Sequence, residues 1–316
     1  VPLQGAAAEG DLTMVSTLLK AGAACSGERE RDGQTPLHAA AQSGSLEVVL
    51  ALLQGQGNGN GNGKAQRDVN KPTRGLRQTP LFVAAKRGHA DVALALVRAG
   101  ADVDLPDGNG WSPLMRAAAD GRAELVNNLL LGGASPSLRS KKGGRALHFA
   151  VQNGHLEVAR VLLKAGASPG ARRKMDGKSA VDLAVERGGE ACEAELLKEL
   201  LAAAGGPGGG GGGCGVDGLD DGGLSALSVA ARGGHAWAIE ALVDAGVDPD
   251  EPNDDQDTPL HLACLHLQPE GVRALLRRGA DETLCNDDFD LPDDVVGHCV
   301  PEENRDEEIV EWIHEV

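Results

Sequence analysis

A short pattern recurs along the chain at intervals close to 33 residues. Copies of the hexapeptide TPLHAA, some close and some loose, begin at positions 35, 79, 112, 145, 179, 225 and 258. The intervals between them are 44, 33, 33, 34, 46 and 33 residues. A repeat of this length predicts a row of small stacked units in place of one large globular core.

The same spacing extends to both ends of the chain. Counting 33 residues forward from Pro259 reaches Pro292, and counting 34 back from Pro36 reaches Pro2. The sequence therefore predicts about nine repeats, of which the two terminal ones are partial or degraded. Because the chain opens on Val1 without a hairpin segment before it, we expect a fragment whose first repeat is cut.

The two long intervals each contain a glycine-rich segment. One is the Gly/Asn run within residues 55–75, and the other lies within residues 204–221. Such segments bury too little apolar surface to offset their ordering entropy, so both are predicted to be flexible insertions. The expected organisation is repeats one to six in residues 1–203, a Gly-rich linker at 204–221, and repeats seven to nine in 222–316.

Each repeat carries the local signals of two helices. Thr35 can cap a helix whose first turn holds Pro36, and Gly44 can end it in a left-handed conformation. The segment that follows the glycine has apolar residues at helical spacing, as at Leu156 and Leu163. One such helix pair cannot hide its apolar face alone, so neighbouring pairs must stack.

The segments Asp32–Gly44 (DGQTPLHAAAQSG) and His155–Ala167 (HLEVARVLLKAGA) resemble the ankyrin repeat. The resemblance covers nearly the whole chain outside the two insertions. It implies an all-α solenoid of helix–turn–helix units joined by short β-hairpin-like loops. It also implies that His38, His148 and His261 form local hydrogen bonds that orient the turn, and that they are not metal ligands.

The resemblance further implies that hairpin tips and first-helix ends form a concave surface that binds a partner protein. The residues that we predict to bind the partner are Gln78, Lys86, Arg87, Trp111, Asp120, Lys141, Lys142, Gln152, Asn153, Arg172, Arg173, Lys174, Lys178 and Arg187. We expect the basic members to gather as a docking strip for an acidic segment, with Trp111 as a rigid anchor. A solvated charged face, and a packing role for Trp111, remain open alternatives.

The acidic residues are concentrated at the C-terminal end. Residues 244–316 hold 22 acids and 4 bases, whereas residues 1–243 hold 25 acids and 26 bases. The acidic end could attract a basic partner or a second copy of the chain. At residues 307–316, Ile309, Trp312, Ile313 and Val316 share one face, which predicts a capping helix with a charged outer side.

Several functional classes lack their signals. The sequence has no GxSxG, GxxxxGK[ST] or HExxH motif, no CxxC pair and no apolar run of roughly 18 residues. We therefore expect no enzyme, no metal or other cofactor, no small-molecule substrate and no membrane span. Aromatic residues form only 2% of the chain and its net charge is −17, which disfavours nucleic-acid binding, although the basic middle repeats keep it open.

The function predicted from these observations is that of an adaptor or scaffold that binds another protein. The alternative is the targeting or regulatory arm of a larger ankyrin-containing enzyme or channel, such as a ligase or kinase. Six scattered cysteines suggest reduced thiols, so we expect a cytoplasmic protein, with the nucleus also open. We expect a monomer.

Overall fold

Helices are the regular secondary structure in the ranges that the computed structural model of the protein describes. These are residues 2–24, 28–29, 31–55, 69–188, 191–204, 220–298, 307, 309 and 312–313. The chain divides into two compact units, which we call unit 1 (Val1–Ala167) and unit 2 (Ser168–Val316). Each unit is a stack of helix pairs, so the predicted all-α repeat solenoid is confirmed.

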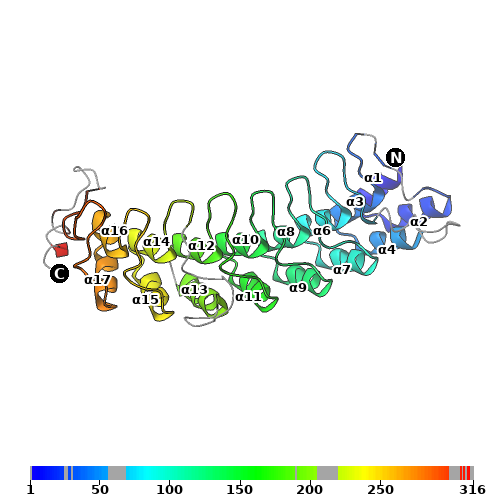
Figure 1. The fold of residues 1–316 in the computed structure, drawn as a ribbon. Coiled ribbons are helices and arrows are strands. Elements are labelled where there is room, and N and C mark those ends of the chain that lie inside the picture. The colour runs from blue at the N-terminus through cyan, green and yellow to red at the C-terminus, as the bar shows by residue number, and fades with distance from the viewer. Residues whose placement is uncertain are drawn as a thin grey trace. The chain divides into compact units, whose positions relative to one another are not determined.

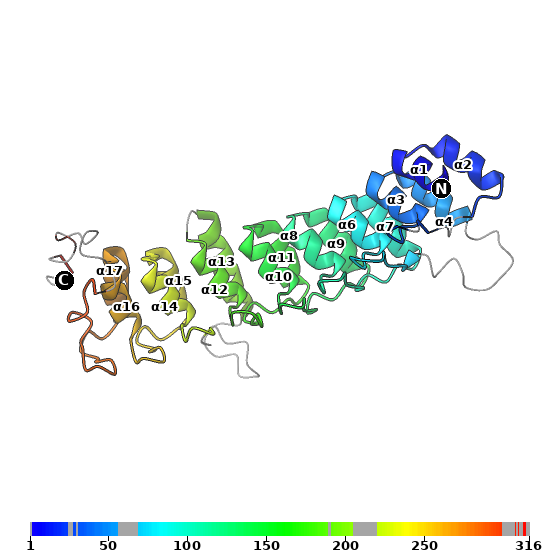
Figure 2. The same cartoon turned by 90° about the horizontal axis from the view of Figure 1, so that it is seen from above.

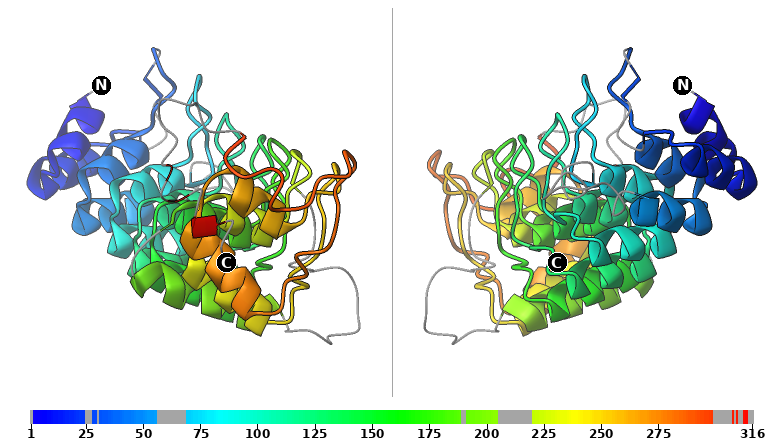
Figure 3. Two further views of the ribbon diagram at one scale, coloured as in Figure 1. Left: turned by 90° about the vertical axis from the view of Figure 1, so that its left-hand side faces the viewer. Right: turned by 90° about the vertical axis from the view of Figure 1, so that its right-hand side faces the viewer.

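Unit 1 contains five helix pairs in the described ranges (Figure 1). The pairs are α1 (Pro2–Glu9) with α2 (Leu12–Lys20), α3 (Pro36–Ser43) with α4 (Leu46–Gly55), α6 (Pro80–Arg87) with α7 (Ala90–Arg98), α8 (Pro113–Ala119) with α9 (Ala123–Leu131), and α10 (Ala146–Gln152) with α11 (Leu156–Lys164). First helices contact first helices of the next repeat, and second helices contact second helices, which gives the two layers seen in Figure 1. Figure 2 shows the same helices from above. The loops that precede α3, α6, α8 and α10 stand to one side of these layers (Figure 3).

Unit 2 repeats this arrangement with three described pairs. They are α12 (Ala180–Glu186) with α13 (Ala191–Ala204), α14 (Ala226–Arg232) with α15 (Ala236–Asp244), and α16 (Pro259–Leu265) with α17 (Pro269–Arg277). Leu227, Ile239 and Leu242 are fully buried between these layers. At the C-terminal end Ile313 is buried, and the Arg273 guanidinium lies 4.8 Å from the centre of the Trp312 ring, so both residues pack on the last repeat.

The predicted helix start is present at Thr35-Pro36, Thr79-Pro80, Ser112-Pro113 and Thr258-Pro259. At α3, the Thr35 hydroxyl accepts the His38 backbone N–H, and the Thr35 backbone N–H donates to His38 Nδ1 at 3.1 Å. The other ring nitrogen, His38 Nε2, bonds the carbonyl of Gln78 in the next repeat at 3.0 Å. His261 does the same with the carbonyl of Asp290, also at 3.0 Å. The local structural role expected for these histidines is therefore confirmed.

The glycine that ends a first helix also lets the next repeat approach. Gly44 has φ +80, and a Cβ placed on it would lie 2.5 Å from a ring carbon of His89. The His89 ring bonds the carbonyl of Gln42 at 3.3 Å. Glycine is thus needed at this position both for its left-handed backbone and for the close contact between repeats.

The structure extends the third repeat further back than the sequence indicated. Residues 69–75 were assigned to the first insertion, but Val69 is buried and the Asn70 side-chain oxygen accepts the Asp102 N–H at 2.7 Å. The Thr73 N–H donates to the Gln78 carbonyl at 2.9 Å, which closes the loop before α6. A run of polar residues after glycines gives no apolar signal from which this loop could be recognised.

The rest of the expected organisation stays a prediction. Residues 56–68 and 205–219, which carry both glycine-rich runs, lie outside the described residues. The boundary between the compact units falls after Ala167, whereas the sequence placed it at residues 204–221. Val316, expected on the capping face, also lies outside the described part.

Candidate protein-binding surface

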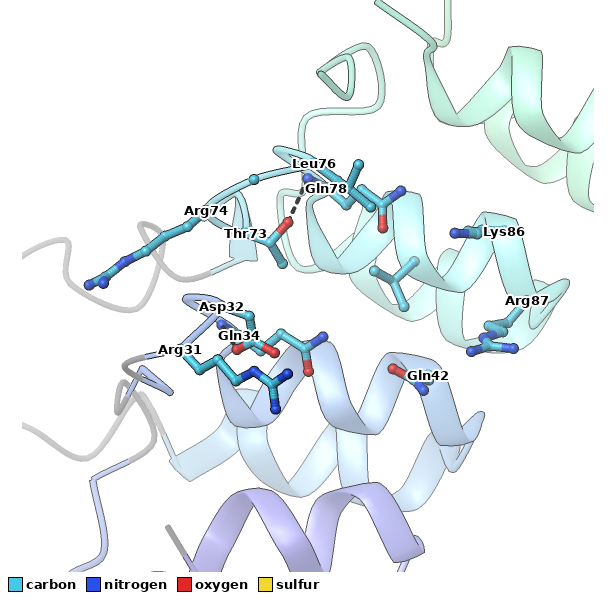
Figure 4. Close-up of a pocket in the computed structure, with 12 residues that line it drawn as sticks. Arg31, Asp32, Gln34, Gln42, Thr73, Arg74, Leu76, Gln78, Lys86 and Arg87 are labelled. Carbon is cyan, nitrogen blue, oxygen red and sulfur yellow. Dashed lines mark hydrogen bonds between the residues drawn. The ribbon is translucent and has the colours of Figure 1, made fainter. Parts of the chain in front are cut away.

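An open groove lies in unit 1 between the loop tips and the first-helix ends of the second and third repeats (Figure 4). We call it the α3/α6 groove; its volume is about 390 Å³. The loop side is lined by Arg31, Asp32, Gln34, Thr73, Arg74, Gly75, Leu76 and Gln78. These residues come from the two loops that lead into α3 and α6.

The helix side of the α3/α6 groove is lined by the last turns of the two helices. Gln42 lies near the end of α3, and Lys86 and Arg87 are the last residues of α6. A neighbouring hollow of about 440 Å³ shares Gln34, Gln42 and Arg87 and reaches Ala8 in α1. The polar surface therefore continues across three successive first helices.

The backbone of the loop side is fixed by hydrogen bonds between repeats. The carbonyl of Gln34 accepts from the Gln4 side chain, and the carbonyl of Gln78 accepts from His38. The Arg74 N–H donates to the Asp32 carbonyl at 2.9 Å, which joins the two loops. Because these bonds use main-chain groups, the Gln34 and Gln78 side chains are left to face the groove, as Figure 4 shows.

Charges on the loop side are partly neutralised within the chain. Lys71 lies 2.6 Å and Arg74 3.2 Å from the Glu28 carboxylate, and the hydrogen bond from Lys71 is the main cause of a lowered pKa of Glu28. Arg29 lies 3.6 Å from Asp32.

Three other cations of the groove keep their charge available. No carboxylate among the described residues pairs with Arg31, Lys86 or Arg87. All three side chains are exposed.

Trp111 is half-buried in the loop before α8 and stacks on a ring of the next repeat. Its ring centre lies 4.2 Å from that of Phe149, with 30° between the planes. The packing alternative for Trp111 therefore describes its contacts better than the role of a free anchor.

Other residues predicted at the surface of unit 1 differ in how free they are. Asp120 accepts two hydrogen bonds from Arg116, at 2.8 and 3.0 Å. Asn153 is exposed but donates to the Ala119 carbonyl at 2.7 Å. Lys141 and Lys142, in the loop before α10, are exposed, as is Gln152.

Three of the predicted basic residues of unit 2 lie in the loop before α12 and pair with carboxylates of that loop or of α12. Arg173 is buried and pairs with Asp176, and Lys178 pairs with Glu186. Arg172 donates to the Gly177 carbonyl at 2.7 Å and lies 3.6 Å from the buried Asp182. Lys174 and Arg187 are exposed.

The docking strip expected from Lys86 to Arg187 is therefore not a uniform row of available charges. Arg172, Arg173 and Lys178 are neutralised because each lies close to a carboxylate three to ten positions further along the chain. The remaining members belong to two units, and the groove lies in unit 1 only.

Sequence reasoning missed Arg31 and Arg74, which line the groove beside the predicted Gln78. The two arginines are 43 positions apart, and the glycine-rich segment between them hides that their loops are neighbours. The signal that could have found Arg74 is its place a few residues before the Thr79-Pro80 helix start.

The described residues offer little for catalysis. Within them, no group of three or more His, Cys, Asp or Glu side chains could hold a metal ion. Burial raises the pKa of the Cys264 thiol to about 12, so this thiol is not a nucleophile near neutral pH. None of the described helices combines the length and the apolar composition of a bilayer span.

A second hollow, of about 500 Å³, lies in unit 2 against α16 and α17. Its lining includes Cys264, Val272, Leu276 and Ile313. Because Ile313 from the C-terminal residues is itself buried there, this hollow belongs to the end of the unit 2 core.

Comparison with known proteins gives one family and a set of curated relatives. A family model described as "Ankyrin repeats (3 copies)" matches residues 2–62, 60–139, 114–207 and 190–284. Protein phosphatase 1 regulatory subunit 27 of Mus musculus is 37% identical over 81 residues, which are 26% of this chain and 53% of the relative. The Homo sapiens protein of the same name is 39% identical over 74 residues, 23% of this chain and 48% of the relative. The chain thus spans about half the length of these relatives.

Proposed function

Because the chain belongs to the ankyrin-repeat family, we propose that it is a non-catalytic module that binds a partner protein through the α3/α6 groove of unit 1. The observation that carries this proposal is the state of the groove itself. Its walls are fixed by main-chain bonds between repeats, while Gln34, Gln42 and Gln78 have no side-chain partner among the described residues. Preorganised walls with unused polar groups favour binding, since less ordering entropy is lost when a ligand arrives.

The curated relatives support a regulatory role. Both are named as regulatory subunits of protein phosphatase 1. We propose by analogy that this chain, too, regulates or localises an enzyme by binding it. Protein phosphatase 1 is the first partner to test, and a larger enzyme or channel that includes this chain as a targeting arm is the alternative.

Two buried titratable groups with shifted pKa values support a non-catalytic role. The pKa of His38 is lowered and that of Asp182 is raised, in both cases chiefly by burial. Each of these side chains forms the helix-start hydrogen bonds of its own repeat. Their environments therefore follow from repeat structure and do not converge on a common cleft.

Site-specific photo-crosslinking tests the proposal. A photoreactive residue is placed at Gln42, inside the groove, and in a matched chain at Lys164, which is exposed at the end of α11 in the same unit. Each full chain is then incubated with cell extract and with purified protein phosphatase 1. We expect a covalent adduct with one protein from position 42 and none from position 164. Equal crosslinking of a co-purifying protein from both positions would show that it does not bind in the α3/α6 groove.

A further inference from the structure

We infer that the α3/α6 groove holds an extended, acidic segment of its partner, with glutamine amides on the segment's main chain and arginine and lysine on its carboxylates. This inference rests on the proposed function, since it names the kind of segment that the same surface binds. Three features of the groove carry it: its amides, its charges and its small number of large apolar side chains.

The glutamines suit a main chain that has no hydrogen bonds of its own. Gln34 and Gln78 occupy equivalent positions in adjacent repeats, and Gln42 faces them from the end of α3 (Figure 4). Each amide offers both a donor and an acceptor. An extended peptide exposes N–H and C=O groups along its length, whereas a helix satisfies these groups internally.

The charges suit carboxylates on both sides of that main chain. Arg31 lies on the loop side, and Lys86 and Arg87 lie on the helix side. The groove lining also includes Asp32, whose carboxylate lies 3.6 Å from Arg29 and is thereby partly neutralised. Successive side chains of an extended peptide point in opposite directions. A run of consecutive Asp or Glu residues would therefore present carboxylates to both walls in turn.

The groove fits other occupants less well. An amphipathic helix needs an apolar stripe to bury, but here the larger apolar side chains of the lining are Val83 and Leu76, and Leu76 lies on a loop tip. Single-stranded nucleic acid needs rings on which bases can stack, and the described lining contains none.

Fluorescence anisotropy with the full chain tests the inference. The probe is a labelled peptide with a run of about eight glutamates, long enough to cross the groove in extended form. The reference is the same peptide with glutamine in place of glutamate. We expect the glutamate peptide to bind with an affinity that falls as salt rises, and the glutamine peptide to bind at least about tenfold more weakly.

Two charge-reversed chains locate the binding. Lys86→Glu with Arg87→Glu changes the groove, and Arg98→Glu with Lys164→Glu changes two exposed bases at the ends of second helices in the same unit. We expect about a tenfold loss of affinity for the first chain and no change for the second. Gln34→Ala with Gln78→Ala should weaken binding several-fold without altering the circular dichroism spectrum.

Equal weakening by the two charge-reversed chains would overturn the inference, since it would show general electrostatic attraction. The inference would also be overturned if a DNA duplex bound more tightly than the glutamate peptide and if the chain with Lys86→Glu and Arg87→Glu no longer bound that duplex. If a protein crosslinks at position 42 but the glutamate peptide does not displace it, the proposed function stands and the inference that the bound segment is acidic is wrong. If the peptide binds at the groove but no protein crosslinks there, the inferred chemistry stands and the proposed function fails.

Discussion

The carboxylate of Asp182 accepts two hydrogen bonds from Ser179, one from the backbone N–H at 2.7 Å and one from the hydroxyl at 2.8 Å. Both bonds reach the same oxygen, Oδ2. The other oxygen, Oδ1, is buried and has no partner among the described residues. Asp182 stands where His38 and His261 stand in their repeats, but it lacks the ring N–H with which those histidines reach the next repeat.

Replacing Asp182 by His should therefore stabilise unit 2. The imidazole would keep the bond from the Ser179 N–H and add a bond to the loop before α14, for a gain of about 1 kcal/mol in the free energy of unfolding. Urea unfolding of the full chain, with hydrogen exchange of the α12 amides, measures this. Lower stability of the variant would show that the 3.6 Å contact between Asp182 and Arg172 matters more.

Asp182 should also make the free energy of unfolding depend on pH. Burial is the main cause of a raised pKa of Asp182, opposed by its bonds to Ser179 and by Arg172, while Asp220 adds to the rise. The folded chain then holds this proton more tightly than the unfolded chain. The contribution of Asp182 to the free energy of unfolding must fall as pH rises from its ordinary pKa of 3.8 through the raised value.

The variant Asp182→Asn removes that titration and provides the comparison. We expect its stability relative to wild type to increase as pH rises from about 4 to about 7, and to level off once the wild-type carboxylate is fully ionised. Urea unfolding of both chains over this range gives the difference at each pH. A difference that does not change with pH would mean that Asp182 ionises as it does in water.

Trp111 is predicted to stabilise unit 1 and not to recognise the partner. Trp111→Ala loses the stack on Phe149 and should cost about 2 kcal/mol of unfolding free energy, whereas Trp111→Phe should cost less because a ring remains. Binding of the glutamate peptide should be unchanged in both variants. A variant that keeps its stability but loses peptide binding would restore the anchor role that the sequence suggested.

Contact between adjacent loops should make one glycine harder to replace than another. Gly110 and Gly133 both have positive φ, at +78 and +92. A Cβ on Gly110 would lie 2.8 Å from the backbone nitrogen of Lys141, whereas a Cβ on Gly133 meets nothing within 4 Å. Gly133→Ala should cost about 1 kcal/mol of stability and Gly110→Ala roughly twice as much, since the loop before α10 must move. Thermal unfolding of the two variants measures both losses of stability. Equal losses would show that the loop before α10 moves away from the added methyl group at no cost.

The helix pairs could be predicted because their signals are local. Thr35, Pro36 and the left-handed backbone of Gly44 define one helix within its own repeat, and the structure places each at the predicted helix end. Repetition of the pattern then identifies the stack without any knowledge of long-range contacts.

The binding surface could be predicted only in part, because it depends on which charges find partners. Lys86 and Arg87 form no ion pair with a carboxylate among the described residues, and both line the groove. Arg173 and Lys178 look equivalent in the sequence, but Arg173 pairs with Asp176 of the same loop and Lys178 pairs with Glu186 at the end of α12. Spacing along the chain does not determine such pairs, since it leaves side-chain direction open.

Whether the partner binds in the α3/α6 groove is tested by filling the groove and measuring the affinity of the partner. Gln42→Trp places a bulky side chain between the two walls, and Lys164→Trp places the same side chain on an exposed second-helix end as a control. Titration calorimetry with the protein that crosslinks at position 42 should show at least about a tenfold loss of affinity for Gln42→Trp and none for Lys164→Trp. Undiminished binding by Gln42→Trp would show that the partner does not enter the α3/α6 groove.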